Sequence, residues 1–393
     1  MCALKKILFV YHVSSIGGGS YCLLNILKSL DRSSVSPYVL LRNDGPLVEE
    51  IRKLDIEVYF LPEIRTVPYN NSTLTISAVV NAYHIIHSFK AFKDIVSKLN
   101  VDAVYLNTMM LYPYLRQVQE LGKKTIIHVR EHWSEDEHKW QRRQAIEHIK
   151  KYADHIVAIN KYSASMLEER AKDVCVVYDW VDFIERNEPI PLNNIFREDV
   201  TNKKIYLFTG GIIRIKGGYQ VLKCFTEKIK GDDKRLLFMG YDMSKPTKGI
   251  NGLLKCFLYK LGFDINEMKI RHIITNDSRI KCIPATYKLV DIIKQSYCML
   301  SYFTIPHANL AMAESLILGT PVVAAWTDEA EEYSQGASHC CLFEMNNANS
   351  FVDVVNKMDV MIKERTPEPA KELKALFSRE YNMEKLNNLF KII

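Results

Sequence analysis

The 393-residue sequence lacks a long apolar run, and this absence limits its relation to membranes. No stretch reaches the roughly 20 consecutive apolar residues that a membrane-spanning helix needs. The first apolar run, Ile7–Tyr11, is too short for a signal peptide and is typical of a buried strand. We therefore expect a cytosolic protein that touches a membrane only with its surface.

The cysteines follow no paired pattern, and the basic residues form no dense tract. There are nine cysteines, an odd number without any Cys-x-x-Cys pair, and Cys340 and Cys341 are adjacent. This indicates reduced thiols and not a disulfide framework or a zinc site. The net charge is only +6, which argues against a nucleic-acid binder. It is compatible with an anionic substrate or lipid headgroups, and equally with ordinary solubility charge.

What is present is enough apolar sequence for two domains, because 48% of the residues are hydrophobic. Short apolar runs alternate with helical patterns, and the alternation begins again after a break. In the first half we expect strands over 7–11, 37–41, 57–61, 103–106, 125–129 and 155–159, and helices over 20–30, 47–54, 78–100, 111–121 and 145–152. In the second half we expect strands over 205–209, 235–239, 298–302 and 321–325, and helices from 218 and over 287–295, 308–318 and 380–393.

This alternation predicts an α/β fold of two doubly wound, Rossmann-like parallel-sheet domains. Pro189, Pro191 and several asparagines interrupt the pattern near 179–201. We therefore place an amino-terminal domain over 1–180, a carboxyl-terminal domain over 181–375 and a final helix over 376–393. Ligands of such sheets lie beyond the carboxyl ends of the strands, so a cleft between the two domains is the expected site.

The first glycine-rich segment, Ser14–Gly19, lies between an expected strand and helix. Glycines admit a ligand close to the backbone, and the following helix N-terminus favours an anion. A phosphate-contacting loop is our preferred interpretation. A dinucleotide fingerprint is an alternative, because Gly17 and Gly19 fit its first two glycines and Asp44 follows the second strand; its third glycine falls on Cys22. A purely structural tight turn is the other.

The second segment, Gly210–Gly218, combines four glycines with Arg214 and Lys216 before a helix. Amide donors, a helix dipole and point charges are what a diphosphate requires. The spacing is not that of a Walker A loop. A solvated basic turn is the plain alternative.

The third segment places Glu314 in an otherwise apolar helix that ends at Gly319. A buried carboxylate needs hydrogen-bond partners, and a pair of sugar hydroxyls would supply them. Alternatively, Glu314 is an ordinary exposed helix residue.

The helix leads into Gly319-Thr320-Pro321-Val322-Val323-Ala324, and here the sequence resembles the retaining GT-B glycosyltransferases of family 4. The resemblance implies that Glu314 holds the nucleotide ribose. The first acid of the family's Glu-x7-Glu pair falls on Pro306, and His307 beside it is a candidate substitute for contacting the donor sugar. The backbone amides near Asn309 and Leu310 would face the diphosphate.

The resemblance covers nearly the whole chain. It implies that Lys216-Gly217 binds phosphate, with Arg214 supplying the family's arginine charge from a shifted position. It also implies that Gly18 and Gly19 close over the donor, and that the final helix crosses back to the first domain.

A further polar cluster, Ile127–Trp133, follows a strand of the first domain. The resemblance implies that His128 contacts the donor sugar, although a histidine in a strand is often purely structural. Arg130 and Glu131 would position an acceptor hydroxyl or pair with each other. Zinc binding by His128 and His132 is only weakly indicated, because the stretch is not evidently helical and lacks a third ligand.

Taken together, these features predict a retaining transferase of surface polysaccharide synthesis, such as O-antigen or capsule. It would move a sugar from a UDP- or GDP-sugar to a saccharide or lipid-linked acceptor. The sequence has no Asp-x-Asp motif, so we expect no metal and no cofactor. The basic stretch Phe89–Lys98 would rest on anionic lipid or pack as an ordinary amphipathic helix. The alternatives are an NAD-dependent oxidoreductase and a non-catalytic, nucleotide-sugar-binding relative.

Overall fold

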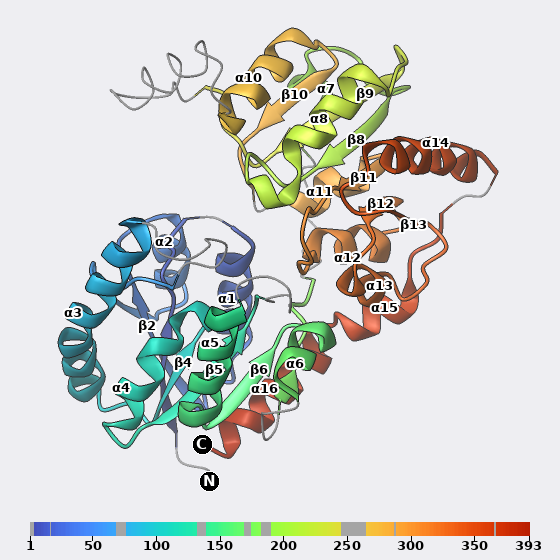
Figure 1. The fold of residues 1–393 in the computed structure, drawn as a ribbon. Helices are drawn as coiled ribbons and strands as arrows, with labels where there is room; N and C mark the ends of the chain where they lie inside the picture. Colours follow the sequence, from blue (N-terminus) through green and yellow to red (C-terminus); the bar gives the residue numbers. More distant parts are fainter. Residues whose placement is uncertain are drawn as a thin grey trace. The chain divides into compact units, whose positions relative to one another are not determined.

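A computed structural model describes residues 4–15, 17–67, 76–131, 139–168, 174–181, 190–244, 265–286, 288–364 and 367–393. The chain divides into two compact units. Unit 1 comprises Met1–Asp182 together with Leu376–Ile393, and unit 2 comprises Phe183–Ala375. Each unit contains one parallel sheet with helices around it (Figure 1). The predicted fold class of two Rossmann-like α/β domains is confirmed.

Unit 1 is built on a seven-stranded sheet with the order β3-β2-β1-β4-β5-β6-β7. Its strands are β1 Lys5–Val10, β2 Val35–Leu41, β3 Glu57–Phe60, β4 Ala103–Leu106, β5 Lys124–Val129, β6 His155–Ala158 and β7 Val174–Val176. Its helices are α1 Gly18–Ser29, α2 Pro46–Arg52, α3 Ile76–Leu99, η1 Met109–Tyr114 (a 3-10 helix), α4 Leu115–Gln119, α5 Lys139–Tyr152, α6 Lys161–Glu168 and α16 Arg379–Lys391. The chain leaves β1 in one direction towards β2 and β3, and returns to the other side of β1 with β4. The boundary between β1 and β4 is thus the switch point of the sheet.

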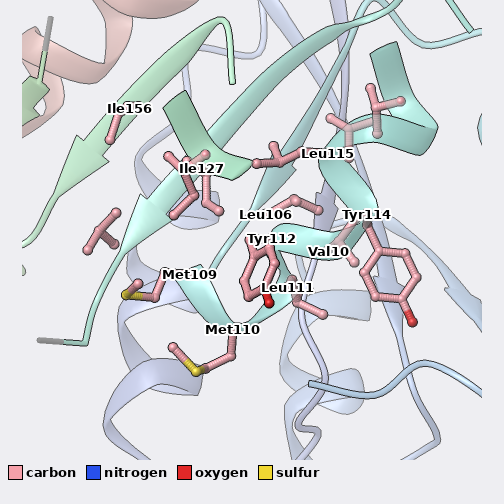
Figure 2. Packing of buried hydrophobic residues seen from close by; sticks show 14 of the residues in the cluster. Val10, Leu106, Met109, Met110, Leu111, Tyr112, Tyr114, Leu115, Ile127 and Ile156 are labelled. Carbon is pink, nitrogen blue, oxygen red and sulfur yellow. The ribbon is translucent and has the colours of Figure 1, made fainter. Parts of the chain in front are cut away.

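The central strands are buried on both faces, which explains why they read as continuous apolar runs. Along β1, Leu8 and Val10 join one hydrophobic cluster, whereas Ile7 and Phe9 join the cluster on the opposite face. Figure 2 shows the first cluster, in which Leu106 and other strand residues pack against the side chains of η1.

The segment 111–121 is not the single α-helix that the sequence predicted. The chain forms η1 first and α4 afterwards. Pro113 lies inside η1 and has no amide to donate to an α-helical ladder. Thr108 caps η1, since its hydroxyl accepts a hydrogen bond from the Met110 amide at 3.2 Å. The buried side chains of η1 therefore fill the core from a tighter turn.

The final helix, α16, belongs to unit 1, as predicted. Met383, Leu386 and Phe390 are buried in the second cluster of unit 1, and Figure 1 shows α16 in red among the blue-to-green elements of that unit. The Asn382 side chain accepts a hydrogen bond from the Tyr178 amide at 2.8 Å. The helix therefore completes both the core and the backbone hydrogen bonding of unit 1.

Unit 2 is built on a six-stranded sheet with the order β10-β9-β8-β11-β12-β13. Its strands are β8 Lys204–Phe208, β9 Lys234–Met239, β10 Ile280–Ile283, β11 Cys298–Ser301, β12 Val322–Ala325 and β13 Cys340–Phe343. Its helices are α7 Leu192–Phe196, η2 Arg214–Lys216 (a 3-10 helix), α8 Gly218–Glu227, α10 Asn266–Asn276, α11 Leu289–Lys294, α12 Leu310–Ile317, α13 Asp328–Ser334, α14 Ala348–Glu364 and α15 Lys371–Leu376. The switch point of this sheet lies between β8 and β11.

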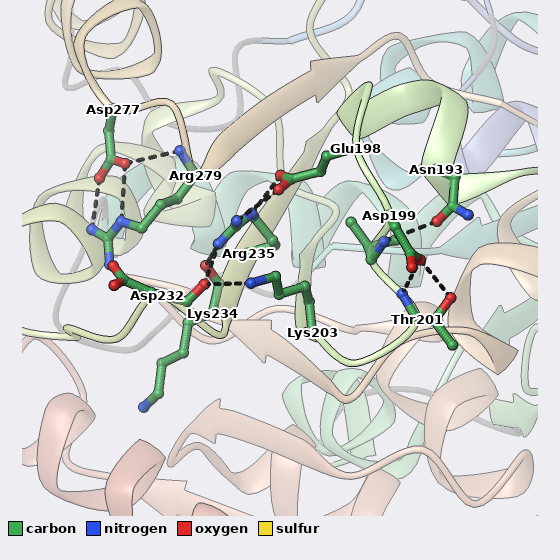
Figure 3. Close-up of polar contacts among 11 residues, drawn as sticks. Asn193, Glu198, Asp199, Thr201, Lys203, Asp232, Lys234, Arg235, Asp277 and Arg279 are labelled. Atoms are coloured by element: carbon green, nitrogen blue, oxygen red, sulfur yellow. Dashed lines mark hydrogen bonds and ion pairs between the residues drawn. The ribbon is translucent and has the colours of Figure 1, made fainter.

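Ion pairs hold the amino ends of the strands of unit 2 (Figure 3). Arg235 donates to both carboxylate oxygens of Glu198 at 2.6 and 2.8 Å. Arg279 donates to both oxygens of Asp277 at 3.0 and 2.7 Å and also to backbone carbonyls of α8 and the turn after it. Arg235 and Arg279 thus have ion-pair partners within unit 2, at the sheet edge opposite to the carboxyl ends of the strands.

Candidate active site

In unit 2, the carboxyl ends of β8 and β11 carry two of the predicted segments. β8 is followed by the glycine-rich loop that contains Arg214 and Lys216, and α8 begins directly after it at Gly218. β11 is followed by the loop that contains His307, and α12 begins after it at Leu310. Two helix N-termini thus start from the switch point of one sheet, where such folds bind ligands.

Close backbone packing fixes the loop after β8. Gly217 has φ +71°, and a Cβ there would collide with Tyr302 on the neighbouring loop. Gly211 has φ +58°, and a Cβ there would lie 2.5 Å from the carbonyl oxygen of Gly240. The Thr304 amide donates to the carbonyl of Ile215 at 2.9 Å and joins the two loops. Glycine is therefore required at both positions, because the backbone is left-handed there and neighbouring backbone leaves no space for a Cβ.

The charge of Lys216 acts on the His307 side chain. Burial lowers the pKa of the Lys216 ammonium. Burial, and secondly the Lys216 charge, lower the pKa of His307 to about 4. His307 is therefore neutral near pH 7, with its ring centroid 5.1 Å from that of Phe303. Arg214 is exposed in η2, one turn before α8.

Asn309 shapes the N-terminus of α12. Its side-chain oxygen accepts from the Met312 amide at 3.3 Å, and its side-chain nitrogen donates to the Ser301 hydroxyl at 2.8 Å. Within the part of the chain that the structure describes, the amides of Leu310 and Ala311 have no hydrogen-bond acceptor. Such unsatisfied amides and the helix dipole favour an anion at this end of the helix.

Glu314 lies one turn into α12 and is buried, with 3% of its surface exposed. Burial raises the pKa of its carboxyl group to about 8. Among the described residues, no donor forms a hydrogen bond or an ion pair with this carboxyl group. A buried acid without a partner is costly to the fold, and this is the condition in which ligand hydroxyls are favourable partners.

In unit 1, the carboxyl ends of β1 and β4 carry Gly18, Gly19 and Asn107. A Cβ at Gly19 would overlap the Tyr11 hydroxyl, whereas a Cβ at Gly18 would meet no atom within 4 Å. The Asn107 side chain donates to the Gly19 carbonyl at 3.4 Å. Gly19 is therefore required by packing, and Gly18 leaves open space at the start of α1.

His128, in β5, is fully buried and held in one tautomer. Its Nδ1 lies 2.6 Å from the Tyr105 hydroxyl and 3.3 Å from Nη2 of Arg130. A guanidinium has only donors, so Nδ1 is the acceptor and Nε2 carries the proton. Burial, and secondly the Arg130 charge, lower the pKa of His128 well below its usual value. Its buried Nε2 has no partner within the described residues, so His128 presents a neutral, unused N–H donor.

Arg130 and Glu131 do not form an ion pair with each other. Nη1 of Arg130 donates to both oxygens of Asp179 at 2.8 and 2.7 Å, and its Nε donates to Asn107 at 3.1 Å. Glu131 accepts from the Thr108 hydroxyl and from the Met109 amide, the latter at 3.1 Å. Burial raises the pKa of Glu131.

The structure thus gathers the predicted residues at one sheet edge in each unit. Unit 2 brings together Arg214, Lys216, His307, Asn309, Leu310 and Glu314. Unit 1 brings together Gly18, Gly19, His128, Arg130 and Glu131.

Tyr105, Asn107 and Asp179 were not predicted as site residues from the sequence. The available signal was that Asn107 directly follows β4 and that Asp179 comes shortly after β7, so both lie near the carboxyl ends of strands. His132 lies outside the described residues, and the described residues contain no group of three or more metal ligands.

No protein-family model and no curated protein matches the sequence. The fold is similar to that of HepE from Anabaena in complex with UDP and glucose, with TM-score 0.71, 15% identity and coverage of 98% of this chain and 99% of that one. It is also similar to sucrose-phosphate synthase from Thermosynechococcus elongatus, with TM-score 0.70, 12% identity and 98% coverage of both chains. A putative UDP-N-acetylglucosamine 2-epimerase from Listeria monocytogenes has TM-score 0.60 and 12% identity over 96% of this chain and 91% of that one. These likenesses establish the GT-B fold.

Proposed function

We propose that the chain is a retaining, family 4 glycosyltransferase that transfers a sugar from a UDP- or GDP-sugar to a saccharide or lipid-linked acceptor. The observation that carries the proposal is in unit 2. Lys216 and the unsatisfied amides of α12 lie at one switch point, and α12 also carries the unpartnered Glu314, before Gly319–Ala324. The fold alone does not choose between transfer and epimerisation, since it is shared by a lipopolysaccharide galactosyltransferase and by the UDP-N-acetylglucosamine 2-epimerase structure. The choice of transfer rests on the family motif.

Unit 2 would bind the donor. Lys216, Arg214 and the amides of Leu310 and Ala311 would neutralise the diphosphate as it leaves with the bonding electrons of the broken C–O bond. Asn309 would hold the helix end in place, and Glu314 would bind the ribose hydroxyls. His307 would contact the donor sugar as a neutral group. Because these cations and dipoles replace the charge of a metal, we expect transfer without a divalent ion.

Unit 1 would bind the donor sugar and the acceptor. His128 would donate its Nε2–H to a sugar hydroxyl, and its low pKa argues against a role as a general acid. Gly18 and Gly19 would approach the donor phosphates. Glu131 would accept a hydrogen bond from the acceptor hydroxyl. Arg130 would also bind the acceptor. Because its Nη1 already donates to Asp179, we expect Arg130 to act mainly through its charge.

We place the reaction in surface polysaccharide synthesis at the inner face of the membrane, in the cytoplasm. This part of the proposal rests on the family resemblance. Among the described residues, none of the helices has the length and apolar character that crossing a bilayer requires.

The test is a panel of UDP- and GDP-sugars, screened first by thermal shift and then for transfer. A bound donor raises the melting temperature. We expect K216A and E314A to abolish transfer while keeping the fold, and the exposed controls K223A and E227A to retain it. NMR of the product would show whether the anomeric configuration is retained. Full activity of K216A and E314A would reject the assigned site.

Three other readouts separate the alternatives. Consumption of reduced nicotinamide, followed by absorbance, would indicate an oxidoreductase. Conversion of a UDP-sugar alone into its epimer would indicate an epimerase. Donor binding without transfer to any acceptor would indicate a non-catalytic relative.

A further inference from the structure

Three basic residues follow the carboxyl ends of β1, β2 and β3, which are neighbouring strands of unit 1. β1 and β2 pair in register up to Val10 and Leu40, and the Tyr11 amide extends the ladder by donating to the Leu40 carbonyl at 3.0 Å. His12 and Arg42 therefore occupy equivalent positions, two residues beyond this pair. The next strand, β3, continues in the same way, because the Leu61 amide donates to the Leu41 carbonyl at 2.9 Å. Arg65 follows in the turn after it.

The backbone contacts of the turn after β3 hold Arg65 in place. Its Nη1 donates to the carbonyls of Pro62 at 2.5 Å and Ile64 at 2.9 Å. Its amide donates to the Tyr114 hydroxyl at 3.4 Å. The guanidinium is thus anchored through one nitrogen, and no carboxylate within the described residues forms an ion pair with it.

Arg42 lies close enough to both neighbours to influence their protonation. Burial, and secondly the Arg42 charge, lower the pKa of His12 to about 4. The same two causes, in the same order, lower the pKa of Arg65. The side chain of Arg42 is exposed and makes no hydrogen bond or ion pair within the part of the chain that the structure describes.

Few acidic residues are available to balance this charge. Glu63 acts on Arg65 through its charge but is exposed and forms no ion pair with it. Asp44 is exposed, and its carboxylate accepts from the Gly45 amide at 2.8 Å. The sequence has no acidic residue between Glu63 and Asp94. Like charges that cluster without a counter-ion repel each other. A bound anion would attract them and so stabilise the cluster.

We propose that Arg42, Arg65 and His12 form a site for a phosphate group carried by the acceptor. A guanidinium matches the geometry of phosphate oxygens and binds them through two parallel N–H donors. The imidazole of His12, neutral near pH 7, adds an N–H donor beside them. The assignment to the acceptor rests on the proposed function, in which unit 2 binds the donor.

The phosphate has two possible sources, a soluble sugar phosphate or a lipid phosphate. α3 leads from the carboxyl end of β3 to the amino end of β4, so its first turns begin at the same edge as Arg65. This half of α3 exposes four apolar side chains, Val79, Val80, Tyr83 and Ile86, at 59%, 46%, 57% and 62%. The lipid source would use this apolar strip, and the soluble source would not.

The first experiment is calorimetric titration of the purified chain with inorganic phosphate, at saturating UDP so that the donor region is occupied. We expect R42Q to weaken phosphate binding by about tenfold, the loss of one charge-assisted contact, and R42K to restore part of it. Arg52 is the matched control, since it is exposed at the other end of α2, towards the opposite sheet edge. Equal phosphate affinity of wild type, R42Q and R52Q would overturn the proposal.

Two further probes distinguish the sources. Glucose 6-phosphate bound by wild type and more weakly by R42Q would identify a soluble phosphate. Vesicles of phosphatidylglycerol that sediment with wild type but not R42Q, while phosphatidylcholine vesicles sediment with neither, would identify a lipid phosphate. If neither probe separates R42Q from wild type, the acceptor-phosphate assignment is wrong.

The failure of this site and the failure of the proposed function give different results. Phosphate binding that depends on Arg42, without transfer from any nucleotide sugar, would keep the anion site and reject the transferase. Transfer that R42Q leaves unchanged for both phosphorylated and neutral acceptors would keep the transferase and reject the anion site.

Discussion

Replacing Glu314 with glutamine should make unit 2 more stable, by an amount that grows with pH. The folded state raises the pKa of this carboxyl group from 4.5 to about 8 through burial. A raised pKa means that the native state holds a proton that the unfolded state has released. The carboxyl group therefore does not weaken the fold below about pH 4.5, and its full penalty is reached as the pH rises through 8. Glutamine has a similar shape and no ionisation, so it escapes this penalty.

The magnitude follows from the pKa difference, at about 1.36 kcal/mol for each unit. Linkage gives a penalty of about 1.4 kcal/mol at about pH 5.5, about 3 kcal/mol at about pH 7 and about 5 kcal/mol above about pH 9. The stability difference between E314Q and wild type should therefore widen by about 2 kcal/mol between the first two conditions.

Urea unfolding without ligand, at several pH values, measures this difference directly. The fluorescence change of unit 2 is the relevant transition, because the two units need not unfold together. E227Q, on the exposed side of α8, is the control and should follow wild type at every pH. A difference between E314Q and wild type that does not change with pH would refute the reasoning.

Three further results are expected. Y105F removes the 2.6 Å contact with Nδ1 of His128. We therefore expect kcat to fall about tenfold, the effect of losing about one well-placed hydrogen bond, while the affinity for UDP is unchanged. An unchanged kcat would contradict a positioning role for Tyr105. G19A should lower the melting temperature because its methyl group meets Tyr11, whereas G18A meets open space and should raise stability by about 0.5–1 kcal/mol while impairing transfer; equal stabilities would contradict this packing. Addition of EDTA should leave the transfer rate unchanged, and restoration of a lost rate by Mg²⁺ would contradict metal independence.

Much of the fold could be predicted because the buried parallel strands read as short apolar runs. Ile7–Val10 and Ile205–Phe208 are examples, and each lies in the centre of its sheet. The edge strands β7, β10 and β13 were missed, whereas the edge strand β3 was predicted. Cys340–Phe343 is only four residues long and lacks a flanking pattern that would separate it from a loop. Edge strands are covered less completely, so their sequences carry less of the hydrophobic signal.

The candidate site also has a part that could be predicted and a part that could not. The positions of Lys216 and Glu314 could be predicted because each residue lies in one contiguous segment with a glycine boundary. The pairing of Arg130 with Asp179 was not, because the two residues are 49 positions apart in the sequence. Only the strand order brings their strand ends together. Sequence spacing could not show that Arg130 forms an ion pair with Asp179.

The return of α16 to unit 1 has a consequence for how the protein forms during synthesis. The amino-terminal 182 residues leave the ribosome first, yet their hydrophobic core lacks Leu386 and Phe390 until the last helix has been made. Every element of unit 2 has by then been translated. We therefore expect the later unit to reach its native state first and the earlier one to wait, partly exposed, for the end of the chain. Ribosome-bound chains that end at residue 378 and continue into an unstructured linker long enough to fill the exit tunnel should show this as protease-resistant unit 2 beside protease-sensitive unit 1.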